Sequence, residues 1–333
     1  MKKANQMTLM DAVMSFSRRS KTSKTVATLA AIEKLVKWHE LVEIVSVLDK
    51  TQTGKGGRPP IAFETKLKML FLQYTFNLSD EELEDQVIDR LSFQQFAGLS
   101  FDEEIPDFTT IWKFKEALVK EKLMDKIFDK IIVSIESHGL ILKKGTIVDA
   151  TIIASGNRPL SKKRREELEK KPSVQIDTEA QSTAKNNKKH FGYKGHIGVD
   201  VGSKIIRKRT FTAANVHDSQ EFEKVLSGDE QSVWGDKAYP NKAAKQAARA
   251  KGIYYGVLEK AKRNQPLSGK QKHRNKQKSR VRAAVEHPFG FMKNKLKMGL
   301  MSAKNKLRNA LRFDMNCIIY NVLRTNFLLK KAI

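Results

Sequence analysis

Cysteine is almost absent from this chain: Cys317 is the only one among 333 residues. A single thiol forms no intrachain disulfide and cannot supply the ligands of a zinc knuckle or a cysteine-rich finger. Long apolar runs are missing as well, since no stretch approaches the roughly 18 consecutive apolar residues of a membrane span. Residues 1–20 lack the apolar centre of a secretory signal. We therefore expect a soluble protein of a reducing, intracellular compartment.

Acidic residues are scarce relative to basic ones. The 37 Asp and Glu face 63 Lys and Arg, which gives a formal net charge of +26 and a pI near 9.9. Such an excess repels itself unless a polyanion neutralises it, and each basic side chain that meets a phosphate releases condensed counterions. Nucleic acid is therefore the expected partner, with a merely solvated basic surface as the alternative.

Helical patterning opens the chain. Apolar residues recur at helical spacing over 25–49, which predicts one or two amphipathic helices in an N-terminal helical arm, residues 1–53. The run 54–60 contains three glycines and two prolines beside two basic residues. Glycine and proline both oppose a helix interior, so this run is predicted to be a basic linker.

A helical domain is expected over residues 61–140, with helix starts at Ser79 and at residues 109–110. The segment 92–118 is compatible with a helix-turn-helix that reads DNA. However, residues 78–108 carry ten acids and one base, which argues against direct phosphate contact. Plain helical packing therefore stands as an equal alternative.

The hydrophobic period changes after Gly139. Residues 145–153 are apolar and rich in β-branched side chains except at Asp149, as expected of a strand buried on both faces. Further strands and helices should alternate after it, which indicates a mixed α/β core over residues 141–303. The predicted strands are 192–201, 205–213, 231–236 and 253–258, and the predicted helices are 219–227 and 241–251.

Three further segments complete the expected organisation. Residues 155–190 are polar and lysine-rich, which predicts a flexible insertion with one short charged helix. Residues 262–282 carry nine Lys or Arg and no acid just ahead of Glu286, which favours a phosphate-tracking role over a solvated loop. Residues 304–333 should form a C-terminal packing helix, because apolar side chains recur along one of its faces.

Two aspartates stand at positions that demand an explanation. Asp149 lies in the middle of a buried strand, where an unpaired carboxylate is costly, so that either a structural salt bridge or a metal ion should compensate it. Asp236 ends another short strand, where the functional groups of α/β sheets gather. Aspartate is also a common turn former, so Asp236 alone is weak evidence.

A third acid, Glu286, falls within about 40° of Arg282 and Lys293 around a predicted helix. This arrangement suits either an ion pair between successive helical turns or a metal ligand between two phosphate contacts. Pro288 should kink this helix or mark its real start. Three carboxylates without cysteine suit Mg²⁺ or Mn²⁺ better than zinc, and two such ions can assist cleavage of a phosphodiester. Spacing alone does not select these three from 37 acids.

Ordered motifs run through most of the chain. The acids lie in Val148-Asp149-Ala150-Thr151, in Trp234-Gly235-Asp236-Lys237-Ala238-Tyr239, and in a set with Arg282, Glu286 and Lys293 separated by three and six residues. Other motifs are Gly192-Tyr193-Lys194-Gly195-His196, Ala214-Asn215-Val216-His217-Asp218, Gly56-Gly57-Arg58-Pro59-Pro60, the run from Leu78 to Asp85, and the run from Pro106 to Ile111. Together they resemble the DDE transposases of bacterial insertion sequences, in particular the insertion-sequence-5 group. Ser279 stands where that family's third motif has a tyrosine.

The resemblance implies an α/β fold: an RNase H-like mixed-sheet catalytic core preceded by an all-helical N-terminal domain. Asp149 should lie on the first strand, Asp236 after the fourth, and Glu286 on a following helix. These three residues are expected to be catalytic and to bind two divalent ions, either Mg²⁺ or Mn²⁺. The first ion would be held by Asp149 and Asp236, and the second would be completed by Glu286.

The same resemblance implies DNA as partner, both the terminal inverted repeats of a mobile element and its target. The expected phosphate contacts are Lys237, Lys278, Arg280, Arg282 and Lys293. A homodimer or higher oligomer on DNA and a place on the nucleoid in the bacterial cytoplasm are also expected. The alternatives are an inactive repressor derived from a transposase and a structure-selective nuclease with the same core.

Other polar residues in or near these motifs are expected to have structural roles or to lie at the edge of the site. Asp200 is expected to be a turn carboxylate, and His217 and Asp218 are expected to cap a turn or to line the edge of the site. His287 follows Glu286 directly but should point roughly 100° away on a helix, so it is not expected to be the general base.

Overall fold

The structure, a computed structural model, describes residues 23–49, 61–100, 103–171, 173, 175–185, 187–239, 242–261 and 263–332. The predicted linker 54–60 and the first 22 residues of the predicted arm lie outside the described residues. No helix in the described part of the chain is long and apolar enough to cross a membrane.

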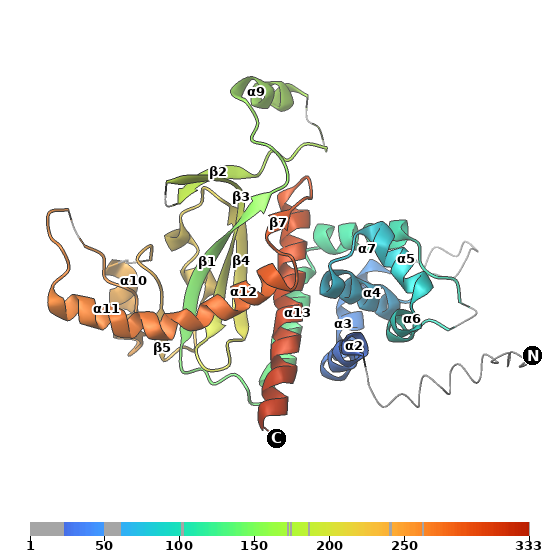
Figure 1. Cartoon of the computed structure of the whole chain (residues 1–333), viewed down its shortest axis with the longest axis horizontal. Helices are drawn as coiled ribbons and strands as arrows, with labels where there is room; N and C mark the ends of the chain where they lie inside the picture. The colour runs from blue at the N-terminus through green and yellow to red at the C-terminus, as the bar shows by residue number, and fades with distance from the viewer. Residues whose placement is uncertain are drawn as a thin grey trace, which may run out of the picture.

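The first part of the chain is helical, as expected (Figure 1). Ser79 begins α5 with a capping box, in which Glu82 N–H donates to the serine side chain and the Glu82 carboxylate accepts from Ser79 N–H. The predicted start at residues 109–110 is wrong by two or three positions, because the Asp107 carboxylate caps α7 by accepting from Thr110 N–H. The helices are α2 (Lys24–Leu35), α3 (Trp38–Val45), α4 (Phe63–Phe76), α5 (Asp80–Asp89), α6 (Leu91–Ala97), α7 (Phe108–Lys120) and α8 (Met124–Glu136), with a short 3-10 turn, η1 (Ser46–Leu48).

The spacing of α6 and α7 does not favour the helix-turn-helix interpretation of residues 92–118. Residues 98–107 separate the two helices, whereas that motif joins its helices by a turn of about three or four residues. Packing accounts for this region instead: Phe93, Phe96 and Ile111 are all buried in one apolar core with α3 and α4.

A seven-stranded mixed sheet follows, with the neighbouring order β2-β3-β1-β5-β6, β4 on β3, and β7 on β1. β1 is antiparallel to β3, with Asp149 opposite Ile197, and parallel to β5. This arrangement around a central β1 confirms the predicted mixed-sheet core of the RNase H-like class. The strands are β1 (Thr146–Ser155), β2 (Gln181–Lys185), β3 (Lys188–Asp200), β4 (Ile206–Ala213), β5 (Ser232–Trp234), β6 (Tyr254–Tyr255) and β7 (Leu300–Met301).

Two expectations about the core need correction. Residues 219–227 form no α-helix; they form two 3-10 turns, η2 (Asp218–Gln220) and η3 (Glu223–Val225). The segment 155–190 contains β2 as well as the expected charged helix, α9 (Lys162–Lys170), because β2 pairs with the first residues of β3. The predicted helix 241–251 is present as α10 (Lys242–Ala250).

One long C-terminal helix, α13 (Lys306–Ala332), joins the helical part to the sheet. In Figure 1 it runs between the sheet and the helices α4 and α7, and it packs against α2, α4, α7, α8 and β4. The Phe313 ring lies against the backbone of Gly195 on β3 and against Phe211 on β4. The Asn321 side chain accepts from Ile206 N–H and donates to Ile206 C=O, which ties the helix to β4.

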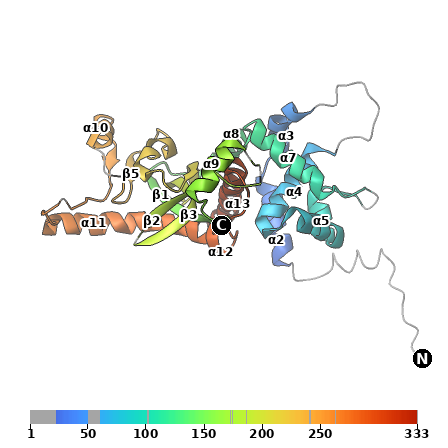
Figure 2. The ribbon, with the colours of Figure 1, turned by 90° about the horizontal axis from the view of Figure 1, so that it is seen from above.

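A helical stretch, residues 269–294, packs against β5 through its first helix and against β1 through the turn that follows it. It comprises α11 (Gly269–Arg282), a 3-10 turn η4 (Ala283–Val285) and α12 (Glu286–Asn294). The break agrees with the expected effect of Pro288, which has no N–H to donate and whose ring crowds the carbonyl of Ala284. Figure 2 shows α11 reaching away from the sheet and α12 lying next to α13.

Candidate active site

Asp149 projects from the middle of β1 and is the best enclosed of the predicted acids. Its side chain is 16% exposed, Oδ1 accepts from Ala150 N–H at 2.9 Å, and Oδ2 accepts from Arg282 Nη2 at 3.1 Å. Burial raises the pKa of this carboxyl, Arg282 opposes that rise, and the charge of Asp236 adds to it. The structural salt bridge considered for Asp149 is therefore present.

Asp236 lies at the loop that follows β5, next to β1 in the sheet. Its Oδ1 accepts from Ala238 N–H at 2.7 Å and its carbonyl accepts from Tyr239 N–H, so it forms the turn. β5 pairs with β1, and the charge of Asp236 contributes to the raised pKa of Asp149, so the two carboxylates lie within electrostatic range of each other. Burial raises the pKa of the Tyr239 phenol most, and the charges of Asp218, Asp149 and Asp236 raise it further. Tyr239 Oη is buried and has no hydrogen-bond partner among the described residues.

Glu286 is not part of this cluster. It is the first residue of α12 and is exposed. Among the residues that the structure describes, no three His, Cys, Asp or Glu side chains form a group that could hold a metal ion. The structure thus brings together Asp149, Asp236 and Arg282 and leaves the third predicted acid one helical turn away from Arg282.

The paired aspartates nevertheless suit a hard divalent cation in their chemistry. Both offer carboxylate oxygens. Their negative charges repel each other at this partly buried site, and a bound divalent cation would neutralise them. Arg282 now supplies part of that neutralisation. A metal bound between Asp149 and Asp236 would therefore compete with Arg282 for Asp149 Oδ2.

The predicted phosphate contacts differ in their surroundings. Lys237 and Arg280 are exposed. Lys293 is half-buried, and burial lowers its pKa. Its Nζ donates to Ile152 C=O at 3.4 Å, in the stretch of β1 between the residues paired with β5 and those paired with β7. Lys278 is a correction: it is buried and its Nζ donates to Val257 C=O at 2.9 Å, so it is not retained as a phosphate contact.

Local hydrogen bonds explain the positions of the other polar residues near these motifs. The Asp200 carboxylate accepts from Gly202 N–H, Ser203 N–H and the Ser203 hydroxyl, as expected of a turn former. The His217 ring accepts from Ser219 N–H and caps η2. His287 lies 3.0 Å from the Tyr320 hydroxyl on α13, away from the acids.

The Gly-Tyr-Lys-Gly-His motif supports the site from β3 in a way that sequence reasoning did not assign. Tyr193 is buried and its hydroxyl donates to Asp177 at 2.8 Å. Lys194 Nζ forms an ion pair with Asp218 at 2.9 Å. His196 is buried beside Thr212. The signal was the clustering of polar residues in an otherwise apolar strand, but their partners lie 16 to 24 residues away in the sequence.

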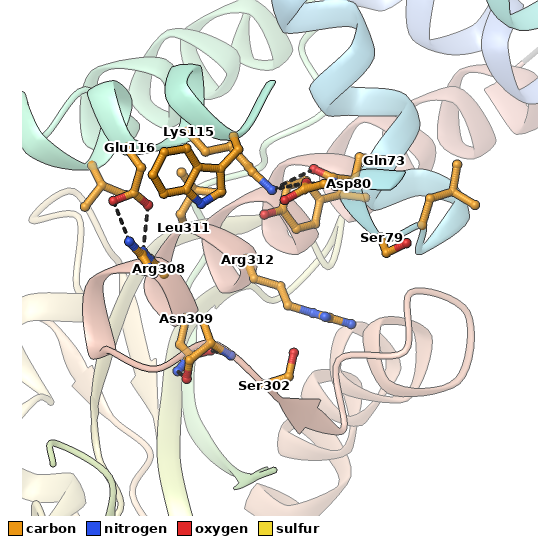
Figure 3. A pocket seen from close by; sticks show the side chains of 15 residues that line it. Gln73, Ser79, Asp80, Lys115, Glu116, Ser302, Arg308, Asn309, Leu311 and Arg312 are labelled. Carbon is orange, nitrogen blue, oxygen red and sulfur yellow. Dashed lines mark hydrogen bonds and ion pairs between the residues drawn. The ribbon is translucent and has the colours of Figure 1, made fainter. Parts of the chain in front are cut away.

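A cavity of about 340 Å³ lies at the seam of α4, α5, α7 and α13, away from the aspartates. Figure 3 shows that its polar side chains face one another: Lys115 binds Asp80 and Gln73, and Arg308 grips Glu116 with two bonds of 2.6 and 2.8 Å. Its charges are thus mostly neutralised from within. We assign it to the packing of the helical part on α13.

Comparison with known families agrees with this geometry. Residues 141–322, just over half of the chain, match the family described as "Transposase DDE domain", and residues 17–117 match "Transposase domain (DUF772)". The chain is 12% identical to a piggyBac transposase in a synaptic complex with hairpin DNA, covering 92% of this chain and 75% of that one at a TM-score of 0.47. It is also 12% identical to a chain of the Mos1 strand transfer complex, covering 87% and 92% at a TM-score of 0.19.

These two structural likenesses are weak, and the family matches carry the assignment. The match over residues 141–322 includes β1 with Asp149, the loop with Asp236 and all of α12. The expectation drawn from the motifs is thereby confirmed at the level of the family. The chain belongs to the Transposase DDE domain family, and it is a DDE-type transposase.

Proposed function

We propose that this transposase cleaves DNA at the ends of an insertion sequence of the insertion-sequence-5 group and joins the freed 3′-hydroxyl to target DNA. The observation that carries the proposal is that Asp149 on β1 and Asp236 after the neighbouring β5 lie within electrostatic range of each other, with Arg282 bound to Asp149 as the resident cation. Holding two like charges near each other in a partly buried site is unfavourable. A chemical role that needs both carboxylates explains why they occur together.

The proposed cofactor is Mg²⁺ or Mn²⁺, in all two ions, held by Asp149 and Asp236 with Glu286 completing the set. Such ions supply activation of a water or hydroxyl oxygen and stabilise the leaving oxygen. Within the chain, Asp149 and Asp236 provide fixed oxygen donors, since each has one oxygen tied to a backbone N–H. Glu286 would have to approach them from the start of α12.

The proposed partner is DNA, both the terminal inverted repeats and the target. A net charge of +26 supports this, and the exposed or half-buried Lys237, Arg280, Arg282 and Lys293 are the proposed phosphate contacts. Each mobile element has two ends and each chain has one aspartate pair, so we propose a homodimer or higher oligomer on DNA. A place on the nucleoid in the bacterial cytoplasm follows from the same partner.

The experiment that tests this function is strand joining by Asp236→Asn. Purified parent protein should nick and join terminal-repeat DNA in Mg²⁺ or Mn²⁺. The variant should lose joining by a factor on the order of 10³ or more while it still binds the DNA. Asp129→Asn is the matched control, because Asp129 is 55% exposed on α8 and, among the described residues, forms an ion pair with Lys208 alone.

The outcomes separate the proposal from its rivals. Normal joining by Asp236→Asn would refute the site. DNA binding by the parent protein without any metal-dependent cleavage would instead indicate a repressor. Cut ends that never appear as joined products would indicate a nuclease.

A further inference from the structure

Helix α11 has one face that is anchored to the protein. Arg274 grips the Glu259 carboxylate with bonds of 2.9 and 3.0 Å, and the Asn275 side chain bonds both N–H and C=O of Glu259. Lys278 donates to Val257 C=O, and Arg282 to Asp149. These positions recur every three or four residues, so they lie on one side of the helix.

The other face of α11 carries basic side chains with nothing to neutralise them. Lys272, Lys276 and Arg280 are exposed, and none of them forms an ion pair with a carboxylate of the described residues. The helix itself contains no Asp or Glu. At 100° per residue this row is centred roughly 150° from the anchored face, so it points away from the protein.

The spacing of this row fits a regular polyanion. Each step of four residues advances about 6 Å along the helix axis. Successive phosphates of one DNA strand rise roughly 3.4 Å along the duplex axis. Because the strand also winds around that axis, the distance between neighbouring phosphates is larger than this rise, and a spacing of about 6 Å between basic side chains is compatible with it. Three like charges at this spacing repel each other unless such a partner neutralises them.

We propose that Lys272, Lys276 and Arg280 bind successive phosphates of one DNA strand and hold that strand along the outer face of α11, whose C-terminal end lies at the acid cluster. The inference rests on the proposed function. It adds which basic residues contact neighbouring phosphates and that these phosphates belong to a single strand. The row ends two residues before Arg282 and six before Glu286. In Figures 1 and 2 the helix leads from the far end of the molecule to α12, which lies beside β1.

The anchored face makes this arrangement rigid. Arg274, Asn275 and Lys278 fix both the rotation and the position of α11 through the segment 257–259. The outward row is therefore held in one orientation. A strand bound to it enters at a fixed distance from Asp149, because Arg282 of the same helix contacts that residue.

The first test measures how DNA affinity depends on salt. Binding of a fluorescein-labelled duplex of arbitrary sequence is followed by anisotropy in EDTA at stepped KCl. Each phosphate contact contributes about 0.9 to the slope of log affinity against log salt, so the triple variant Lys272→Gln/Lys276→Gln/Arg280→Gln should lose about 2.7. A fourfold rise in salt should then weaken the triple variant about 40-fold less than the parent.

A matched pair of single variants isolates the orientation of the charge. Arg280→Gln and Arg274→Gln remove the same group from the same helix, but only Arg280 faces outward without an acid partner. Arg280→Gln should lower the slope by about 0.9. Arg274→Gln should leave it unchanged, because Asn275 and Lys278 still anchor the helix to residues 257–259. An equal loss in both, or an unchanged slope in the triple variant, overturns the proposal.

A single-stranded probe tests whether one strand is followed. A row that binds one strand should also contact the phosphates of a single-stranded probe. The slope of log affinity against log salt should then fall by about 0.7 per substituted residue and by about 2.1 for the triple variant. A triple variant that loses slope on the duplex but not on the single strand would show that the row spans two strands, and would overturn the proposal.

Cysteine protection keeps the proposal testable if the triple variant does not fold. The natural Cys317 is fully buried, so a maleimide should report only an introduced thiol. Lys276→Cys should react freely and become protected by saturating duplex, whereas Lys330→Cys at the far end of α13 should react equally with and without DNA. Unprotected Lys276→Cys overturns the inference. Failure of the parent to bind DNA at all would instead overturn the proposed function.

Discussion

Exchange of Arg282 for glutamine should strengthen divalent-cation binding and weaken DNA cleavage at the same time. The Arg282 guanidinium lies 3.1 Å from Asp149 Oδ2, with the two side chains 26% and 16% exposed. It therefore holds the position from which a cation would contact that oxygen. Glutamine keeps a hydrogen-bond donor but removes the competing charge.

The size of the effect follows from two opposing energies. Coulomb attraction at this distance is about 5 kcal/mol at an effective dielectric constant of about 20. Loss of hydration opposes most of it, since burial keeps the pKa of Asp149 raised in spite of Arg282. A remainder of about 1.4 kcal/mol would make cation affinity about tenfold higher in Arg282→Gln.

Calorimetric titration with Mn²⁺ measures this affinity without DNA. Arg280→Gln is the control, because it removes the same charge two residues earlier on α11 from a side chain that meets no acid. Screening should limit its effect to a small change. Equal Mn²⁺ affinity in both variants, or weaker binding in Arg282→Gln, would refute the competition between Arg282 and the metal. Cleavage by Arg282→Gln should fall in either case if Arg282 contacts a phosphate.

Two further predictions concern the support of the site. Burial, aided by the charges of Lys194 and Lys224 and opposed by Asp218 and Glu221, lowers the pKa of His196 to about 4, so the unfolded chain, with a pKa near 6.5, takes up the proton first. The contribution of neutral His196 to the free energy of unfolding should be fully present above about pH 6.5. It should fall by about 3 kcal/mol as the pH drops to about 4. Urea unfolding across that range should show a shallower decline in His196→Gln, and an identical decline would contradict the assignment. Gly195→Ala would place Cβ 2.4 Å from Phe313 Cε2 and should lower the free energy of unfolding by about 1–3 kcal/mol; adding Phe313→Leu should recover part of the loss, and no recovery would mean that the strain lies elsewhere.

Sequence patterns predicted the strands in which β-branched residues recur. β1 and β4 begin and end within two residues of their predictions, and both contain several Ile, Val or Thr. Residues 219–227 have helical composition and still form two 3-10 turns. Their path is set from outside: Lys194 holds Asp218, and Val225 C=O lies so close to Gly198 that no Cβ would fit there. Neither contact is visible in a local window of sequence.

Polar edge elements escaped prediction for a related reason. β2 reads Gln-Ser-Thr-Ala-Lys and has neither an apolar face nor regular alternation. It is a strand because β3 continues beyond the residues paired with β1 and offers free N–H and C=O groups to it. A short polar strand at such an edge is stabilised by its partner more than by its own side chains.

The acid site shows the same division between local pattern and long-range geometry. The positions of Asp149 and Asp236 in the fold could be predicted, because each residue is tied to a strand and neighbouring strands fix where their residues lie; their catalytic role stays a proposal. A continuous α-helix, at 100° per residue, would place Glu286 on one face with Arg282, but residues 283–285 form a 3-10 turn. Such a turn advances about 120° per residue, so three residues add roughly 60° and rotate Glu286 away from the line through Arg282. The distance of the third acid from the aspartates therefore depends on the twist of η4 next to Pro288. A return of η4 to α-helical twist would reverse that rotation, and divalent cations, by drawing Glu286 toward Asp149, would favour it.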